Sequence, residues 1–332
     1  MNRENNFNLL RLLLALSVVV VHTAELLQRV EIAEVSRYFS SVVAVDSFFI
    51  VSGFLIFMSY ENSSSLGSYL SKRFRRIAPA YVVVILFWAI FLYFLSSKSF
   101  GEYFSMELWS YIISNLTTLN FLHPTIDGIF EDNYISSING ALWTIKIEVT
   151  FYLLVPIIIY LFRKIGRLPL IFIIYILAIS YSLLMVYLFD SSGNSIFLKL
   201  EKQIPSQLAF FISGALLYYY YDKFSKNALL LLIVSSILLY IHHSVAPIYP
   251  LYPMSLAIVI IYFATQVRYL FSFGNYSDIS YGLYIWHFPT IQLFVYYHLF
   301  DNLAFGIPLL VATLLIVSSL SWSLIEKRFL ST

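Results

Sequence analysis

Long apolar runs recur along almost the whole chain, and they constrain the fold more than any other feature of the sequence. A run of about 20 apolar residues is long enough to cross the hydrocarbon layer of a bilayer as a helix. Such runs occur at residues 8–27, 41–60, 77–96, 142–162, 168–189, 205–221, 227–243, 250–267, 279–298 and 303–325. The sequence therefore predicts an all-α membrane protein, a polytopic bundle of about ten transmembrane helices.

The amino-acid composition of the chain limits the classes of function that are possible. Of the 332 residues, 60% are hydrophobic and 11% are charged, whereas a soluble domain is about half apolar and a quarter charged. The runs take up the length, so we expect residues 1–332 to form a single integral-membrane domain with no appended soluble domain. A net charge of +2 and a single dense basic cluster, at residues 72–76, argue against nucleic-acid binding. Without cysteine, thiolate nucleophiles and Cys-ligated metals are excluded, and we expect no metal cofactor.

The distribution of Lys and Arg predicts the orientation. If the N-terminus is cytoplasmic, the inside segments carry thirteen Lys and Arg residues and the outside segments five. The positive-inside rule then places both termini in the cytoplasm, and we expect membrane lipids to surround the protein. The longest connection, residues 97–140, lies outside in this topology. Its apolar stretch 106–122 is expected to form an amphipathic or re-entrant element.

Ionisable residues inside the apolar runs are candidates for function, because they are costly in a membrane. Arg11 and His22 lie eleven residues apart in the first run, on one face of a helix and about 16 Å apart along its axis. Near the cytoplasmic side, Arg73 and Arg76 precede the third run at a spacing that puts both on one side of a helix. Guanidinium groups suit phosphate, so these arginines are candidate anion binders.

In the outer half, Asp46 and Glu148 lie at about the level of His22. An imidazole beside a carboxylate is the arrangement of a general base, because the carboxylate holds the tautomer and stabilises the imidazolium. The sequence leaves open whether Glu148 or Asp46 is the partner. It also leaves open a second use of such groups, a proton or ion relay in a transporter or flippase. His287 lies in the ninth run, one turn after Tyr284, as a packing residue or a substrate contact.

Several segments taken together resemble the acyltransferase 3 family of integral-membrane O-acyltransferases that modify sugars. The resemblance spans residues 7–328, and its segments occur in the family's order. They are Asn8 to Arg11 with His22, Val45 to Phe54, Lys72 to Tyr81, Asn139 to Tyr152, Ser280 to Pro289, and Glu326 with Lys327.

This resemblance implies a membrane-bound, acyl-CoA-dependent enzyme. Such an enzyme takes an acyl group, usually acetyl from acetyl-CoA, on the cytoplasmic side and delivers it to a sugar hydroxyl at the outer side. The resemblance implies His22 as the catalytic base, and Arg11, Arg73 and Arg76 as donor-binding residues. We expect the acceptor to be a cell-envelope polysaccharide or a lipid-linked glycan, and the membrane to be a bacterial cytoplasmic (inner) membrane. Trp143, Tyr284 and His287 are the expected substrate-binding residues.

Overall fold

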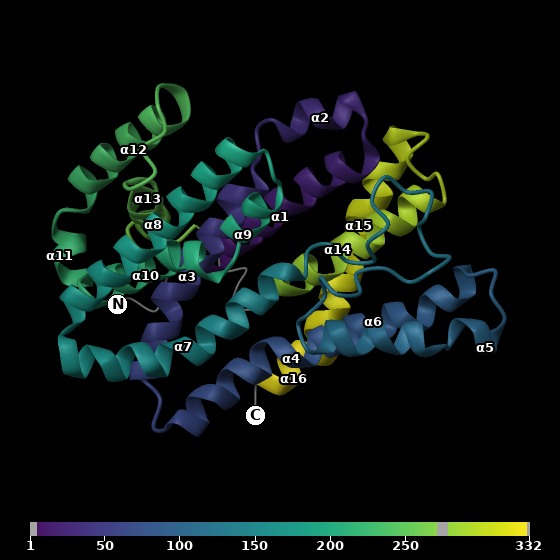
Figure 1. The fold of residues 1–332 in the computed structure, drawn as a ribbon, viewed down its shortest axis with the longest axis horizontal. Helices are drawn as coiled ribbons and strands as arrows, with labels where there is room; N and C mark the ends of the chain where they lie inside the picture. Colours follow the sequence, from purple (N-terminus) through teal and green to yellow (C-terminus); the bar gives the residue numbers. More distant parts are fainter. Residues whose placement is uncertain (1–4, 271–277, 331–332) are drawn as a thin grey trace. The chain divides into compact units, whose positions relative to one another are not determined.

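Every regular element in the computed structural model, which describes residues 5–270 and 278–330, is a helix (Figure 1). The elements are α1 (Phe7–Leu27), α2 (Val30–Ser36), α3 (Ser41–Glu61), α4 (Leu66–Phe91), η1 (Leu92–Leu95), α5 (Phe100–Tyr103), α6 (Met106–Leu116), α7 (Trp143–Ile165), α8 (Arg167–Ser192), α9 (Ile196–Glu201), α10 (Ile204–Tyr219), α11 (Tyr221–Lys226), α12 (Ala228–Ser244), α13 (Tyr252–Thr265), α14 (Ser280–Tyr296), α15 (Leu303–Ser321), η3 (Trp322–Glu326) and α16 (Lys327–Leu330).

The all-α prediction is confirmed, and each of the ten apolar runs contains a helix. Within the described ranges, six helical segments are long and apolar enough to cross a membrane: Phe7–Leu27, Val30–Glu61, Leu66–Leu95, Trp143–Ile165, Arg167–Ser192 and Leu303–Leu330. The remaining four runs form the shorter helices α10, α12, α13 and α14. The count of ten spans stays a prediction. The chain ends lie outside the described residues, and their cytoplasmic placement is also still a prediction.

The third run differs from expectation at its start. Its helix, α4, begins at Leu66, eleven residues before the apolar stretch. The Ser65 hydroxyl accepts a hydrogen bond from the backbone N–H of Ser68, which is a typical helix N-cap interaction. Arg73 and Arg76 therefore lie within the helix instead of before it. A hydropathy pattern misses this start because the first turns of α4 are polar.

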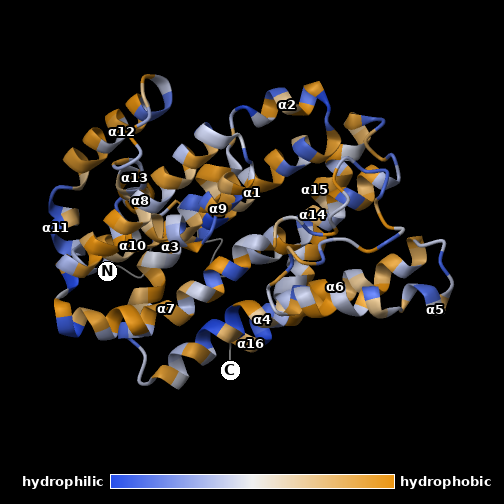
Figure 2. Cartoon of the chain, viewed as in Figure 1, coloured by the Kyte–Doolittle hydropathy of each residue, from blue (hydrophilic) through white to orange (hydrophobic). Residues whose placement is uncertain are grey.

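Large apolar side chains lie on the outer faces of the long helices. Leu153, Ile176 and Ile316 are between 58% and 60% exposed. Figure 2 shows apolar residues along most of the helix lengths, with hydrophilic residues gathered at helix ends and connections. Extensive exposed apolar surface of this kind requires a lipid environment. The chain is an integral membrane protein.

The chain divides into two compact units, each assembled from separate segments. Unit 1 comprises Met1–Leu10, Val45–Leu70 and Ile147–Ser272, and unit 2 comprises Arg11–Ala44, Ser71–Lys146 and Phe273–Thr332. That residues 1–332 form a single integral-membrane domain stays a prediction, which this division does not test.

In unit 1, α10 packs against both α8 and α13, and α12 packs against α13. Two glycines allow α3 and α10 to approach at the backbone. A Cβ at Gly214 would lie 2.0 Å from the Ile50 carbonyl oxygen, and one at Gly53 would lie 1.9 Å from that of Phe211. Small residues at such contacts are typical of helix packing in membranes.

Unit 2 is built around α14, which has 13 of its 17 residues buried. Helix α1 runs parallel to α14. Arg11, near the start of α1, contacts Asp278 just before α14, and His22 contacts His287 further along both helices. Helix α4 is parallel as well, since Ile77 accepts a hydrogen bond from the Tyr281 hydroxyl and Trp88 packs on Trp286 further along. This arrangement agrees with the predicted topology, in which the first, third and ninth runs cross in the same direction.

Candidate active site

Two histidines meet between α1 and α14. His22 Nδ1 lies 2.8 Å from His287 Nε2, within hydrogen-bond distance. The two rings stack with centroids 5.1 Å apart, and the Phe288 ring packs edge-on against His22. His287 is fully buried, whereas the His22 side chain is 15% exposed. Of the two imidazoles, His22 is the one that a substrate can approach.

The remaining ring nitrogens of this pair have different surroundings. His287 Nδ1 lies 2.7 Å from the Tyr284 carbonyl oxygen and 3.2 Å from that of Leu283. His22 Nε2 lies 3.9 Å from the Glu25 carboxylate, which is 52% exposed. That distance is an ion-pair separation and too long for a hydrogen bond. His287 is thus tied into the backbone of α14, and His22 Nε2 is left directed at a solvated carboxylate.

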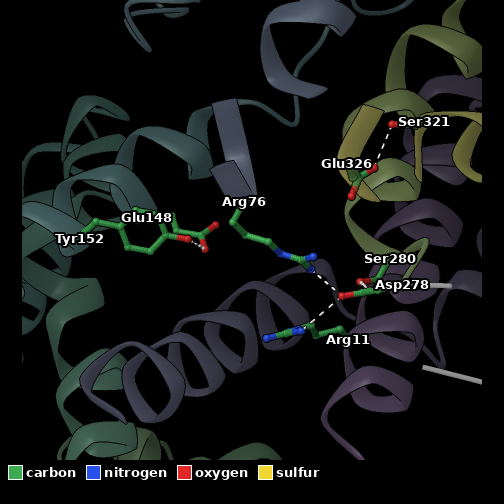
Figure 3. A network of polar contacts seen from close by, with 8 residues as sticks. All are labelled: Arg11, Arg76, Glu148, Tyr152, Asp278, Ser280, Ser321 and Glu326. Atoms are coloured by element: carbon green, nitrogen blue, oxygen red, sulfur yellow. Dashed lines mark hydrogen bonds and ion pairs between the residues drawn. The ribbon is translucent and has the colours of Figure 1, made fainter. Parts of the chain in front are cut away.

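Two arginines converge on one carboxylate at the opposite end of the same helix pair (Figure 3). Arg76 Nη2 donates to Asp278 Oδ2 at 2.6 Å, and Arg11 Nη1 contacts the same oxygen at 3.4 Å. The Ser280 hydroxyl donates to the other carboxylate oxygen at 2.6 Å. Arg11 and Arg76 keep 25% and 20% of their side chains exposed. The guanidinium groups are therefore directed at a single anionic point.

Asp278 precedes the first residue of α14 and is 8% exposed. Burial by itself raises the pKa of this carboxyl, but the charges of Arg76 and Arg11, with the hydrogen bonds from Ser280 and Arg76, lower it to about 2. Asp278 is consequently ionised at neutral pH. Nothing in the sequence pattern singled out this residue. Arginines within a membrane protein require a counter-charge, and an acidic residue just ahead of the ninth run could supply it. That requirement could have indicated Asp278.

The two carboxylates expected to partner His22 belong to unit 1. Asp46 is buried and accepts a hydrogen bond from the Tyr252 hydroxyl at 3.4 Å. Glu148 accepts a hydrogen bond from the Tyr152 hydroxyl, one helical turn later, at 2.6 Å (Figure 3). Each carboxylate thus has a tyrosine partner inside its own unit. The expectation that one of them orients His22 stays a prediction.

The long connection at residues 97–140 is fastened to α14 at several points. Pro289 lacks an N–H, so the Ile285 carbonyl has no helical partner, and the Asn139 side chain donates to it at 2.9 Å. Further along, Gln292 is fully buried and donates to the Ser137 carbonyl at 2.8 Å. Asn139 is a second residue whose role only the structure reveals. These contacts hold the loop against the helix that carries His287.

The other expected substrate residues lie where this loop enters α7. The Tyr284 hydroxyl is 2.7 Å from the Thr144 hydroxyl and donates to the Ala141 carbonyl at 3.2 Å. Trp143, the first residue of α7, is partly buried. Within residues 106–122, Met106–Leu116 form the helix α6, and an interfacial or re-entrant position of this stretch stays a prediction.

Two further features complete the geometry of unit 2. Arg73 lies three residues before Arg76 in α4, on the same side of the helix, and is partly buried. Glu326 is 2% exposed on the π-helical turn η3, where the Ser321 hydroxyl donates to it at 2.9 Å (Figure 3). Among the residues that the structure describes, no group of three or more His, Asp or Glu side chains is placed to hold a metal ion.

Comparison with known proteins gives full-length similarity to acyltransferases. The profile of a family described as "Acyltransferase domain" matches residues 4–325. An "O-acetyl transferase" of Shigella phage Sf6 is 30% identical over 342 residues, covering 100% of this chain and 97% of that protein. "Nodulation protein 10" of Rhizobium leguminosarum bv. viciae is 31% identical over 170 residues, which is 48% of this chain and 46% of that protein. "Acyltransferase MdmB" of Streptomyces mycarofaciens is 26% identical over 123 residues, 37% of this chain and 30% of that protein. No solved structure matches the chain.

Proposed function

Because the chain belongs to the acyltransferase 3 family, we propose that it is an O-acetyltransferase that uses acetyl-CoA from the cytoplasm. The acceptor is a sugar hydroxyl of a cell-envelope polysaccharide or a lipid-linked glycan at the outer side of a bacterial cytoplasmic membrane. The observation that carries the proposal is the arrangement on α1 and α14, with an arginine pair at one end and an accessible imidazole eleven residues further along α1.

The arginines supply the donor site in this proposal. Arg11 and Arg76 both contact the same carboxylate oxygen of Asp278, so their guanidinium groups are oriented to share an anion. A phosphate group of the donor would take a similar place, with Arg73 beside it on α4. The pantetheine arm would then extend along α1 toward His22, a distance of about 16 Å.

His22 is the general base. Its Nε2 removes the proton from the acceptor hydroxyl while that oxygen attacks the acetyl carbonyl carbon and forms the new ester bond. The bond from that carbon to sulfur breaks, and the proton passes from His22 to the departing thiolate. Sugar hydroxyl and acetyl-CoA thus become acetyl ester and free CoA. The sequence has no cysteine to form an acyl-cysteine intermediate and no Gly-x-Ser-x-Gly motif, so direct transfer is favoured.

Two aromatic residues belong to the proposed acceptor side. They are Trp143 and Tyr284, which lie where the external loop joins α7. A transporter or flippase that used the same groups as a proton relay would not consume acetyl-CoA.

The test is NMR of base-labile O-acetyl groups on the envelope polysaccharide of a host that lacks this gene, complemented with wild type or His22→Ala. His123→Ala is the matched control, because His123 is an exposed histidine of the external loop. We expect acetyl signals with wild type and His123→Ala and none with His22→Ala at equal expression. Equal signals from both histidine variants would refute His22 as the base, and no signal from wild type would refute acetyl transfer.

A further inference from the structure

The hydrogen-bond partners of His287 determine which of its nitrogens carries a proton. Both oxygens near Nδ1 belong to backbone carbonyls, which only accept hydrogen bonds. His287 Nδ1 must therefore be protonated. The side chain is fully buried, and its contacts in the described structure are neutral groups, so a second proton would place an uncompensated charge in the core. His287 is neutral, and its Nε2 carries a lone pair.

The tautomer of His22 follows from that of His287. Since His287 Nε2 can only accept, His22 Nδ1 must donate across the 2.8 Å contact. A neutral His22 with a proton on Nδ1 has its lone pair on Nε2. The Glu25 carboxylate lies 3.9 Å from that atom, which is too long for a hydrogen bond that would favour a proton there. Both hydrogen bonds in this series therefore have one direction. His22 Nδ1 donates to His287 Nε2, and His287 Nδ1 donates to the backbone carbonyl.

We propose that His287 is a positioning residue that fixes His22 in the tautomer with a free Nε2, the form that a general base requires. This inference rests on the proposed function, because the tautomer matters only if His22 removes a proton. His287 takes the place that a carboxylate usually has beside a catalytic histidine. The difference is that an imidazole partner orients the base without adding a second charge inside the membrane.

The geometry separates this role from substrate contact. His287 has no exposed surface, its Nδ1 is occupied by the α14 backbone, and its Nε2 is occupied by His22. No ring nitrogen is left for a sugar hydroxyl. The structure thus favours a different role for His287 from the substrate binding expected from the sequence.

The first test reads the tautomer directly, without substrate. Protein labelled with ¹⁵N-histidine is placed in lipid bilayers, and solid-state NMR distinguishes protonated from unprotonated ring nitrogens. His22 signals are assigned by their loss in His22→Ala. We expect His22 to be protonated at Nδ1 in wild type and to show a mixture of tautomers in His287→Leu. A wild-type His22 protonated at Nε2 would overturn the inference, whatever the enzyme's activity.

The second test compares two substitutions at position 287. In His287→Gln the side-chain amide oxygen remains as an acceptor near the position of Nε2, whereas His287→Leu has no acceptor. We expect kcat for acetyl transfer to fall at least tenfold in His287→Leu, with the KM for acetyl-CoA unchanged, and to recover largely in His287→Gln. Equal losses in the two variants, or a loss confined to KM, would contradict the positioning role.

These two tests fail in different ways. If the proposed function is wrong, no variant transfers acetyl groups, yet the tautomer of His22 can still be measured. If His287→Leu does not fold, the wild-type spectrum and the His287→Gln kinetics still decide the question. A Gln variant with a reversed His22 tautomer and full kcat would refute the inference.

Discussion

Replacing Asp278 with asparagine removes the carboxylate that Arg11 and Arg76 both contact. The pKa of Asp278 lies at about 2, against an ordinary value of 3.8. One pKa unit corresponds to about 1.4 kcal/mol, so ionised Asp278 stabilises the folded protein by about 2 kcal/mol. In a protein of this size, such a loss lowers Tm by roughly 3 °C. We expect Asp278→Asn to show a decrease of this order in the absence of donor.

The same variant tests whether the arginines bind the donor. In Asp278→Asn the two guanidinium groups lose the carboxylate that they share, and phosphate groups of CoA would supply a negative charge in its place. We therefore expect CoA to raise the Tm of Asp278→Asn by more than it raises that of wild type. The measurement is the tryptophan fluorescence of the purified protein in detergent during heating, with and without CoA. It needs no acceptor sugar.

Asp127→Asn is the matched control, because it breaks the exposed ion pair with Lys98. Exposed pairs contribute 0 to about 1 kcal/mol, so its Tm should change little. Two outcomes would refute the reasoning. An unchanged Tm in Asp278→Asn would show that the cluster contributes no stability, and an equal CoA shift in both proteins would show that the arginines do not hold the donor.

The stability difference between wild type and Asp278→Asn also has a defined pH dependence. The folded-state pKa of Asp278 is lower than the unfolded value, so its contribution is complete above about pH 5 and is lost as the pH falls through about 4 toward 2. We expect a constant Tm difference between pH 5 and 8 that shrinks below pH 4. A difference that grew on acidification would contradict this assignment.

Two further predictions concern the donor site and the support of α14. Arg76→Lys loses the planar guanidinium fork, and we expect the KM for acetyl-CoA to rise about tenfold with little change in kcat, while Arg75→Lys on the same helix leaves both parameters near wild type. Asn139→Ala leaves the Ile285 carbonyl without a partner and should cost about 1–3 kcal/mol of stability. That cost should shrink in a Pro289→Ala background, where the restored N–H can bond the carbonyl, and an equal cost in both backgrounds would disprove the explanation.

Periodicity and hydropathy predicted the parts of this structure that depend on local sequence. Each apolar run forms a helix because membrane-spanning backbone must satisfy its own hydrogen bonds. Arg11 and His22 reach the same partner segment because eleven residues bring a helix back to nearly the same face. The start of α4 was predicted wrongly, since a capping serine extends that helix through polar residues that hydropathy does not count.

The partners of these residues could not be predicted in the same way. His22 and His287 are separated by 265 positions in the sequence, and nothing in the local pattern of either helix specifies their pairing. Chemical analogy favoured a carboxylate as the partner of a catalytic imidazole, so it directed attention to Glu148 and Asp46. Asp278 could not be singled out in this way, because it lies just outside an apolar run, where an acidic residue is unremarkable.

The helix pair of α1 and α14 explains why charged and neutral contacts are separated along its length. At one end, Arg11, Arg76 and Asp278 together carry one net positive charge, which suits an anionic donor and lies where α1 and α14 begin. Further along, a second charged pair would be costly in a membrane, and the contact there consists of two imidazoles, of which His287 also donates to a backbone carbonyl. A neutral pair has a consequence for the proposed reaction. The imidazolium formed on His22 has no charged partner on its Nδ1 side, so it is favoured to return its proton quickly to the thiolate. The same pairing that directs the lone pair of His22 toward the acceptor thus also favours the second proton transfer.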